Sequence, residues 1–296
     1  MFDERVPVPE FKGRITAELG IQLEKYRQRL VVNNYSEHTI VGYVRAIKRL
    51  NGYYNRSLES LKEDELVGFV CSLKEHYKLS VSSMRIAVGA IKYFYRNVID
   101  QDALIGKMPF PKKEYRINTI LTGSEVKRLF DLTYNLKDRL ILKIIYSAGL
   151  RRSEVINLRP EDFDWKNMQI RIRQGKGKKD RLTVLARSVQ SDYLAYLKEY
   201  EPKDILFFAS DRSIPAYGKM IYRIMNDAVK RAGINKDVSV HTLRHSFASH
   251  LLSLNTDIVT VQKLLGHERI QSTMHYLHLN HRFNTEPRSP MDVIYK

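Results

Sequence analysis

The segment His241-Thr-Leu-Arg-His-Ser-Phe-Ala-Ser-His-Leu-Leu252 combines an apolar stripe with a cluster of basic side chains. Its apolar residues recur with helical spacing and predict one buried side of a helix: Leu243, Phe247 and Leu251. His241 and Arg244 are three residues apart and His245 follows, which places these three on another face of the same helix. Imidazole beside guanidinium suits an anion that needs both charge and proton transfer, and phosphate is the usual anion of this kind.

Zinc is a competing interpretation, because His241 and His245 have the i, i+4 spacing of metal-binding helices. The metalloprotease pattern requires Glu directly after the first His, whereas Thr242 stands there. Arg244 between the two imidazoles would also repel a dication. A third interpretation makes these histidines merely structural. Among the three, the segment favours a phosphate site without metal ligands.

Two motifs upstream offer further charged groups. Arg151 and Glu154 are three residues apart, so the carboxylate can hold the guanidinium through a bidentate bond. Gly175-Lys-Gly-Lys-Lys179 is a glycine-rich turn with several lysines, among them Lys176. It lacks the Gly-Lys-Ser/Thr ending of a nucleotide-binding loop, so ATP is not implied. Taken alone, these motifs are more typical of an ordinary helix ion pair and of an exposed turn.

Composition excludes several classes of protein. The chain has 296 residues, 43% of them hydrophobic, and 50 Lys and Arg against 33 Asp and Glu give a net charge of +17. This length suggests two domains, and the apolar content favours folded cores over a disordered basic tail. Cys71 is the single cysteine, which excludes a disulfide scaffold. No apolar run approaches the ~18 residues of a membrane span, so we expect a cytoplasmic protein, or a nuclear one in a eukaryote. The charge is compatible with nucleic acid, an anionic membrane surface or an acidic protein, and the lack of a block of five like charges disfavours the membrane.

Helix signals dominate the chain, and we predict a mainly α fold with a small antiparallel sheet. A helical domain is expected over residues 1–106, followed by a basic, proline-interrupted linker at 107–122 and a second domain at 123–296. In the second domain, Gln169–Arg173 and Arg181–Leu185 predict a hairpin around the glycine-rich turn. Ile205–Phe208 is a candidate for a third short strand.

Two predicted helices of the first domain carry basic residues on one face. Each face alone is typical of solvated helix surface, but two such faces in one small bundle favour contact with phosphates. The predicted DNA contacts are Arg45, Lys48 and Arg49 on a helix capped by Ser36, Arg85, Lys92 and Arg96 on a helix from about Ser82 to Val98, and Lys112 and Lys113 in the linker.

Together with Leu-Leu-Gly-His267 and Tyr276, these motifs resemble the tyrosine recombinase/phage integrase family, in its simple two-domain, Xer-like form. Each match is short, but all of them occur in the family's order. The resemblance covers most of the chain. It implies that the first domain is the family's helical, SAM-like core-binding domain and that the second is its catalytic domain.

The resemblance also implies a role for each matching position. Tyr276 would attack a DNA phosphate and form a 3′-phosphotyrosyl bond, releasing a 5′-hydroxyl. Arg151 and Arg244 would clamp the non-bridging oxygens, and Glu154 would orient these arginines. Lys176 would be the acid that protonates the leaving oxygen. His241 would assist proton transfer from the tyrosine, and His267 would form a hydrogen bond with the phosphate.

The same resemblance implies a homo-tetramer on double-stranded DNA with paired inverted binding sites, and no cofactor. The apolar tail Ser289–Tyr295 is a candidate for docking on a neighbouring protomer, with a loosely ordered terminus as the alternative. Two other functions stay open at this stage. One is a non-catalytic DNA-binding protein with the same fold, and the other is a type IB topoisomerase-like enzyme that acts alone.

Overall fold

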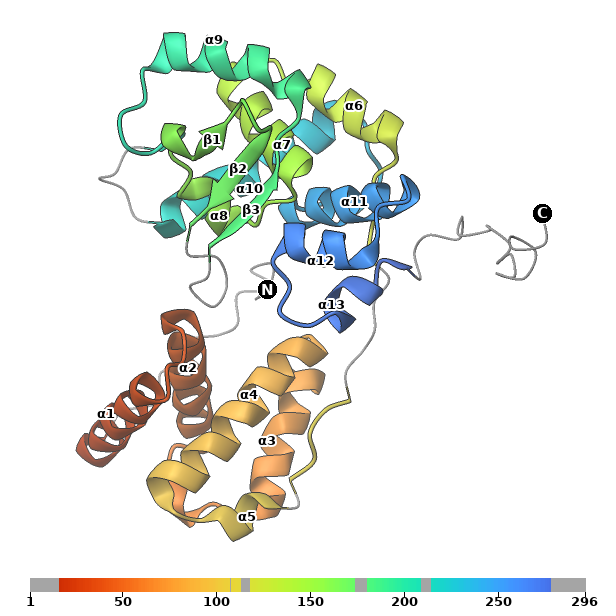
Figure 1. Cartoon of the computed structure of the whole chain (residues 1–296). Helices are drawn as coiled ribbons and strands as arrows, with labels where there is room; N and C mark the ends of the chain where they lie inside the picture. Colours follow the sequence, from red (N-terminus) through yellow and green to blue (C-terminus); the bar gives the residue numbers. More distant parts are fainter. Residues whose placement is uncertain (1–15, 107, 113–117, 174–179, 209–213, 278–296) are drawn as a thin grey trace, which may run out of the picture. The chain divides into compact units, whose positions relative to one another are not determined.

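The chain forms two compact units, Met1–Arg116 (unit 1) and Ile117–Lys296 (unit 2), and is mainly helical as predicted (Figure 1). The division falls within the segment predicted as the linker. The structure, a computed structural model, describes residues 16–106, 108–112, 118–173, 180–208 and 214–277. Lys113, Lys176 and the tail Ser289–Tyr295 lie outside the described residues.

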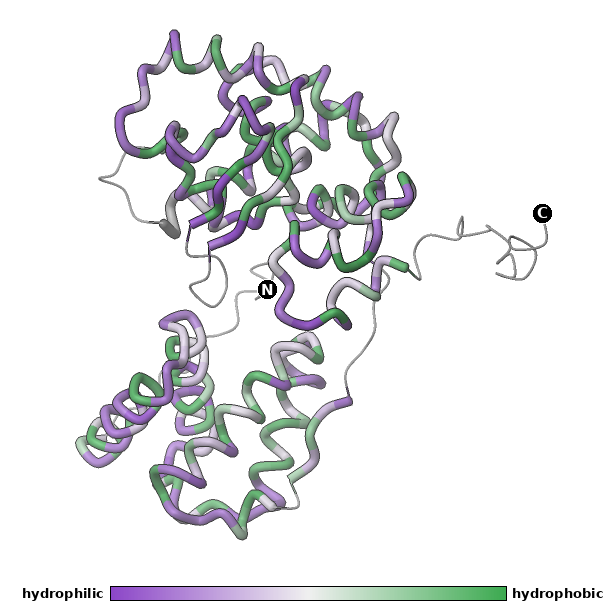
Figure 2. The backbone as a smooth tube through the Cα atoms, viewed as in Figure 1, coloured by the Kyte–Doolittle hydropathy of each residue, from purple (hydrophilic) through white to green (hydrophobic). Residues whose placement is uncertain are grey.

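Unit 1 is a helical bundle in which α2 packs against α1 and α4, and α3 against α4 (Figure 1). Ser36 caps α2, as predicted, by accepting a hydrogen bond from the backbone N–H of Thr39 (3.2 Å). Apolar and polar residues alternate along α3 and α4, as expected for helices with one buried side (Figure 2). The helices are α1 Ala17–Val32, α2 Glu37–Tyr54, α3 Glu63–Glu75, α4 Val81–Phe94, which a π-helical turn extends over Tyr95–Ile99, and α5 Asp102–Gly106.

Two buried tyrosines tie the bundle together through backbone carbonyls. The hydroxyl of Tyr26 donates to the carbonyl of Ala90 (2.8 Å), which joins α1 to α4. The hydroxyl of Tyr95 donates to the carbonyl of Leu58 (2.6 Å). Both rings are fully buried, so each brings a large apolar surface into the core while its hydroxyl stays paired.

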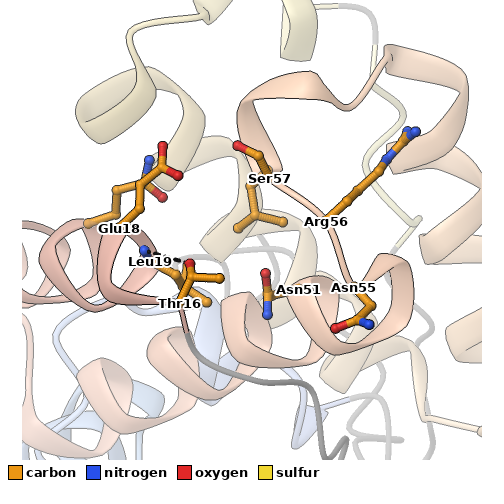
Figure 3. A pocket seen from close by; sticks show the side chains of 9 residues that line it. Thr16, Glu18, Leu19, Asn51, Asn55, Arg56 and Ser57 are labelled. Carbon is orange, nitrogen blue, oxygen red and sulfur yellow. Dashed lines mark hydrogen bonds between the residues drawn. The ribbon is translucent and has the colours of Figure 1, made fainter.

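A small pocket in unit 1 lies between the N-terminal end of α1 and the C-terminal end of α2 (Figure 3). Its volume is about 120 Å³, and Glu18 and Arg56 are the charged side chains in its lining. None of the residues predicted to act in catalysis lines it, since those residues all belong to unit 2.

Unit 2 places α11 against α7 and α12, and α12 also contacts the sheet at β3 (Figure 1). Thr122 caps α6 in a capping box with Glu125. The helices are α6 Gly123–Asp131, α7 Leu136–Ala148, α8 Arg152–Ile156, α9 Gln190–Tyr200, α10 Ile214–Arg231, α11 Val240–Ser253, α12 Ile258–Leu265 and α13 Gln271–Met274. Within the described residues, no helix is long and apolar enough to cross a membrane.

The sheet has three antiparallel strands in the order β1-β2-β3: Phe163–Asp164, Gln169–Ile172 and Arg181–Val184. The predicted hairpin is therefore confirmed. The predicted third strand at Ile205–Phe208 is wrong, because β1 takes that place and 205–208 is an irregular segment. Leu206, Phe207 and Phe208 are all buried, and a strand with one buried face would instead bury every second residue.

Both described ends of the predicted linker pack into a core. Met108 is buried in the core of unit 1, and Leu121 is buried in the core of unit 2. The N–H of Leu121 also donates to the hydroxyl of Ser246 on α11 (2.9 Å). The entry of the chain into unit 2 is thus fixed on the helix that carries the basic cluster.

The turn between α7 and α8 requires glycine at position 149. Gly149 ends α7 with a φ of +61°, a conformation that side chains other than glycine rarely adopt. A methyl group added there would lie 2.4 Å from a ring carbon of Phe247 on α11. Helix α11 can therefore approach α7 closely only because this residue has no side chain.

We expect Gly149→Ala to lower the free energy of unfolding of unit 2 by about 1–3 kcal/mol, through backbone strain and overpacking against Phe247. Trp165 is the single tryptophan of the chain and lies in unit 2, so urea unfolding followed by its fluorescence reports on this unit. Gly123→Ala is the matched control, because a methyl group there meets nothing within 4 Å. Equal unfolding midpoints for the two variants would contradict this account of the turn.

Candidate active site

Glu154 lies at the centre of a cluster of three arginines in unit 2, Arg151, Arg181 and Arg244. Its carboxylate accepts four hydrogen bonds: from the backbone N–H and Nη1 of Arg151, both at 2.7 Å, and from Nη1 and Nη2 of Arg181 at 2.7 and 2.9 Å. The predicted ion pair between Arg151 and Glu154 is present. Arg151 stands at the N-cap of α8 and Arg181 is the first residue of β3, so the carboxylate joins a helix to the sheet.

Arg244 reaches the same carboxylate from α11. Its guanidinium lies 3.7 Å from Oε2 of Glu154 and is 4% exposed. Nη1 donates to the carbonyl of Gly149 (2.5 Å), at the C-terminal end of α7. Such carbonyls have no partner within their own helix and carry partial negative charge, so they stabilise a buried cation.

Three successive backbone carbonyls at the C-terminal end of α12 each accept a hydrogen bond from a different arginine. The bonds join Arg181 to Leu264 (2.9 Å), Arg244 to Leu265 (2.5 Å) and Arg151 to Gly266 (3.2 Å). Gly266 has a φ of +63°, and a methyl group there would lie 2.7 Å from Cδ of Arg181. The arginines thus cap α12 where its last carbonyls would otherwise lack partners.

The charges of the cluster shift the pKa values of its members. Burial alone would raise the pKa of Glu154, but the bonds and charges of Arg181 and Arg151 outweigh it and lower the pKa to about 2. Burial, aided by the charge of Arg151, lowers the pKa of Arg244 to about 9. Glu154 is therefore ionised and Arg244 is protonated at neutral pH.

The hydroxyl of Tyr276 forms a hydrogen bond with Nδ1 of His245 (2.8 Å), and the tyrosine is only 3% exposed. Burial raises the pKa of Tyr276 above its ordinary value of 10.0, and the charges of Arg244 and Arg151 partly oppose this shift. Burial lowers the pKa of His245 to about 4, with smaller contributions from His241 and Arg244. Both members of the bond are therefore neutral at neutral pH.

His241 lies one helical turn before His245, and their ring centroids are 6.5 Å apart. Burial lowers the pKa of His241, and the charge of Arg244 adds to the shift. Among the residues that the structure describes, no three His, Cys, Asp or Glu side chains are placed to hold a metal ion together. The i, i+4 spacing of these histidines places His245 against Tyr276 and His241 one helical turn away from His245.

His267 follows the α12 cap directly and faces the tyrosine. Its ring is nearly parallel to that of Tyr276, with centroids 6.4 Å apart. Its Nδ1 bonds the buried hydroxyl of Thr273 (2.9 Å), which fixes the orientation of the ring. Burial, followed by the charge of Arg244, lowers the pKa of His267 to about 3, so the ring is neutral.

The basic residues predicted to contact DNA lie in unit 1 with different degrees of exposure. Arg85 donates to the carbonyl of Pro111 and stacks over the ring of Phe110 (4.4 Å from guanidinium to centroid), and Arg96 pairs with Asp102 (2.7 Å). The exposed members are Arg45, Lys48, Arg96 and Lys112, and the half-buried members are Arg49, Arg85 and Lys92.

Sequence reasoning missed two members of the cluster, Arg181 and His245. Arg181 lies two residues after the glycine-rich turn Gly175–Lys179, and the signal that could have pointed to it is the need of a buried carboxylate for more than one partner. His245 shares the predicted helix face with His241 and Arg244, but the spacing assigns it no role. Spacing alone puts His241 and His245 on one face and cannot decide which ring meets the tyrosine.

Each unit matches a model of a known protein family. Residues 119–282 match the model of the phage integrase family, and residues 23–104 match the phage integrase N-terminal SAM-like domain. The chain belongs to the phage integrase family. A putative integrase/recombinase of Sinorhizobium fredii is 30% identical over 292 residues, 95% of each chain, and tyrosine recombinase XerA of Pyrococcus horikoshii is 31% identical over 260 residues, 86% of this chain and 87% of the relative.

The fold of this integrase family member agrees with solved structures. XerH site-specific recombinase bound to its palindromic difH substrate superimposes with a TM-score of 0.70 at 24% identity, over 88% of this chain and 81% of that one. The chain is thus a tyrosine-type site-specific recombinase of DNA, with a SAM-like helical domain and an integrase catalytic domain. The buried arginine cluster and Tyr276 lie in the catalytic domain.

We expect Glu154→Gln to lower the free energy of unfolding of unit 2 by about 3–5 kcal/mol, because it leaves buried guanidinium groups without their countercharge. The folded-state pKa of about 2 lies below the ordinary value of 4.5. The stability that ionised Glu154 contributes is therefore fully present above pH 4.5 and is lost as the pH falls from 4.5 to 2. Urea unfolding followed by Trp165 fluorescence measures both effects.

The matched control is Glu161→Gln, because the Glu161 side chain is 61% exposed and pairs at the surface with Arg173. We expect that change to cost at most about 1 kcal/mol. Between pH 4.5 and 2, the free energy of unfolding of Glu154→Gln should fall less steeply than that of the unaltered chain. Identical acid profiles for the two would show that folding does not lower the pKa of Glu154.

Proposed function

We propose that this recombinase cleaves and rejoins DNA through a covalent 3′-phosphotyrosyl bond formed by Tyr276. The observation that supports this most is that Tyr276, the neutral imidazoles of His245 and His267 and the guanidinium groups of Arg151 and Arg244 lie together in one small region of unit 2. Arg151 and Arg244 lie close enough for their charges to act on the tyrosine hydroxyl. Such a site holds a nucleophile and the cations that phosphoryl transfer requires.

In the proposed reaction, the oxygen of Tyr276 forms a bond to phosphorus as the bond from phosphorus to the 5′-oxygen breaks. Negative charge grows on the non-bridging oxygens, where Arg151 and Arg244 stabilise it. Each guanidinium has further N–H donors beyond those bound to carbonyls and to Glu154. An arginine at a transferring phosphoryl group can contribute ~10³–10⁵ in rate.

Two protons move in this step. We propose that neutral His245 accepts the hydrogen bond of the Tyr276 hydroxyl and takes its proton as the bond to phosphorus forms, and that His241 assists this transfer once phosphate is bound. Lys176, five residues before Arg181 in the chain, is the proposed acid that gives a proton to the leaving 5′-oxygen. His267 is the proposed hydrogen-bond donor to a non-bridging oxygen.

Rejoining is the same reaction in reverse. A 5′-hydroxyl attacks the phosphotyrosine, whose bond energy equals that of the phosphodiester it replaced, so the proposal needs no ATP. The arginines supply the positive charge that metal ions supply in other phosphoryl-transfer sites. Glu154 contributes by keeping two of these cations, Arg151 and Arg244, in one place.

The proposal includes a tetramer on double-stranded DNA with paired inverted binding sites. Exchange between two duplexes breaks every strand once, and one tyrosine per protomer then requires one protomer per strand. A head-to-tail contact closes such a ring, and the tail Ser289–Tyr295 is the proposed docking segment. The relatives named above come from a bacterium and an archaeon, whose DNA lies in the cytoplasm, so the proposal places the enzyme there.

We expect Tyr276→Phe to bind a DNA site as tightly as the unaltered chain but to form no covalent adduct, because only the hydroxyl is lost. The substrate is a nicked duplex that carries the site found by footprinting on DNA next to the gene. Adducts are counted on denaturing gels, in buffer with EDTA and without nucleotide. Tyr134→Phe is the control, because Tyr134 is 73% exposed in the same unit and should leave adduct formation unchanged.

Other outcomes would contradict the proposed mechanism or favour a different function. Adduct formation by Tyr276→Phe would assign the nucleophile elsewhere, and a requirement for a divalent metal or ATP would refute the proposed mechanism. Binding without any adduct by the unaltered chain would favour a non-catalytic DNA-binding protein. Relaxation of supercoiled DNA without strand exchange between paired sites would favour a topoisomerase-like enzyme.

We expect Lys48→Ala to weaken DNA binding and to make the negative slope of log affinity against log salt shallower by about 0.9, as the loss of one phosphate contact does. Lys48 is exposed on α2, within the proposed basic face. Lys74→Ala removes another exposed lysine of unit 1 from α3, outside that face, and should leave the slope unchanged. Equal slopes for both variants would remove α2 from the proposed DNA surface.

A further inference from the structure

We propose that Arg181 is a positioning residue for strand cleavage, which holds Glu154 so that the carboxylate in turn sets the guanidinium of Arg151 for the phosphate. This inference rests on the function proposed above for the same site. It adds to the site a residue that acts through another side chain and does not itself touch DNA.

Arg181 has a protein acceptor at every side-chain nitrogen, which uses three of its five N–H groups. Its Nη1 and Nη2 bind the two oxygens of Glu154, and Nε binds the carbonyl of Leu264. The side chain is 10% exposed, against 19% for Arg151. Arg181 is thus less exposed than Arg151 and is bound to protein at every side-chain nitrogen.

Arg151 and Arg181 each donate two hydrogen bonds to the carboxylate of Glu154. Oε1 accepts from Nη1 of both Arg151 and Arg181, and Oε2 accepts from the backbone N–H of Arg151 and from Nη2 of Arg181. Without Arg181, only bonds from Arg151 would hold the carboxylate, and both groups could move together. A bidentate partner on the far side fixes the plane of the carboxylate, and through it the direction of the Arg151 guanidinium.

The place of Arg181 in the chain extends this effect to the rest of the site. Arg181 begins β3, and its bond to Leu264 joins that strand to the end of α12, next to the carbonyls that hold Arg244 and Arg151. Displacement of a reacting group by about 1 Å can reduce a rate about 10²-fold. Loss of Arg181 should therefore slow chemistry more than it weakens DNA binding.

The test uses the full chain and the nicked duplex described above, at saturating protein, so that the rate of adduct formation reports chemistry alone. We expect Arg181→Gln to slow adduct formation about 10–100-fold, with a dissociation constant for DNA within about 3-fold of the original. Arg181→Lys keeps the charge but cannot bind both carboxylate oxygens in one plane, so it should show the same pattern with a smaller loss.

The matched control is Arg171→Gln on the neighbouring strand β2. Arg171 is 55% exposed and pairs with Asp180 at the surface, so its loss should change neither the rate nor the affinity by more than about 2-fold. Urea unfolding followed by Trp165 fluorescence shows whether each variant is folded. If Arg181→Gln is unfolded under assay conditions, Arg181→Lys decides the question by the same split between rate and affinity.

A second substrate shows whether an Arg181 variant is slow because Arg151 is misplaced or because the glycine-rich turn with Lys176 is displaced. In this substrate, sulfur replaces the 5′-bridging oxygen of the DNA, so the bond from phosphorus to sulfur breaks and a thiolate leaves without needing a proton. This substrate should restore adduct formation to Lys176→Ala, which lacks the proposed acid. It should not restore the rate of Arg181→Gln, whose proposed defect lies at the non-bridging oxygens.

Three outcomes would overturn the inference: an unchanged rate for a folded Arg181 variant, a loss of DNA affinity as large as the loss of rate, or full rescue by the sulfur substrate. Absence of any adduct from the unaltered chain is a different result, which refutes the proposed function of the site. Full activity of the unaltered chain together with full activity of Arg181→Gln refutes the role of Arg181 alone.

Discussion

The catalytic unit depends on one shared carboxylate, that of Glu154, which lets like charges occupy a single buried region. Arg151, Arg181 and Arg244 would repel one another there and would each lose hydration. Glu154 lies against all three, and four hydrogen bonds to two of them replace the water it has lost. The last carbonyls of α12 add a second set of acceptors on the other side. The cluster keeps an excess of positive charge, which is what a phosphate group requires.

Two glycines make this arrangement geometrically possible. Gly149 and Gly266 both have positive φ values and both end helices, α7 and α12. Each presents its carbonyl to an arginine, Gly149 to Arg244 and Gly266 to Arg151. The missing side chains leave room for a Phe247 ring carbon at one turn and for the stem of Arg181 at the other. The apolar packing of α11 and the polar bonds of the cluster are therefore fixed by the same turns.

The sequence was informative where a feature depends on neighbours in the chain, and less so where it depends on distant ones. The ion pair of Arg151 with Glu154, the cap at Ser36 and the β2–β3 hairpin all follow from local spacing, and all are present. The pairing of Arg181 with Glu154 joins residues 27 positions apart, which no helical or strand period indicates. The segment 205–208 shows the same limit, because its run of apolar residues fits a strand but its burial comes from tertiary packing.

Under the proposed function, the state of Tyr276 constrains how cleavage can occur. Burial raises the pKa of its hydroxyl, and the charges of Arg244 and Arg151 offset only part of that shift. A phosphate bound between these arginines would neutralise some of the charge that opposes the shift, and so would disfavour a preformed phenolate further. The hydroxyl must then lose its proton as the bond to phosphorus forms, and the neutral His245 at 2.8 Å is placed where that proton departs. In the proposed mechanism, proton transfer and attack would therefore be coupled, and the arginines would lower the barrier through the charge on the phosphate oxygens more than through the acidity of the tyrosine.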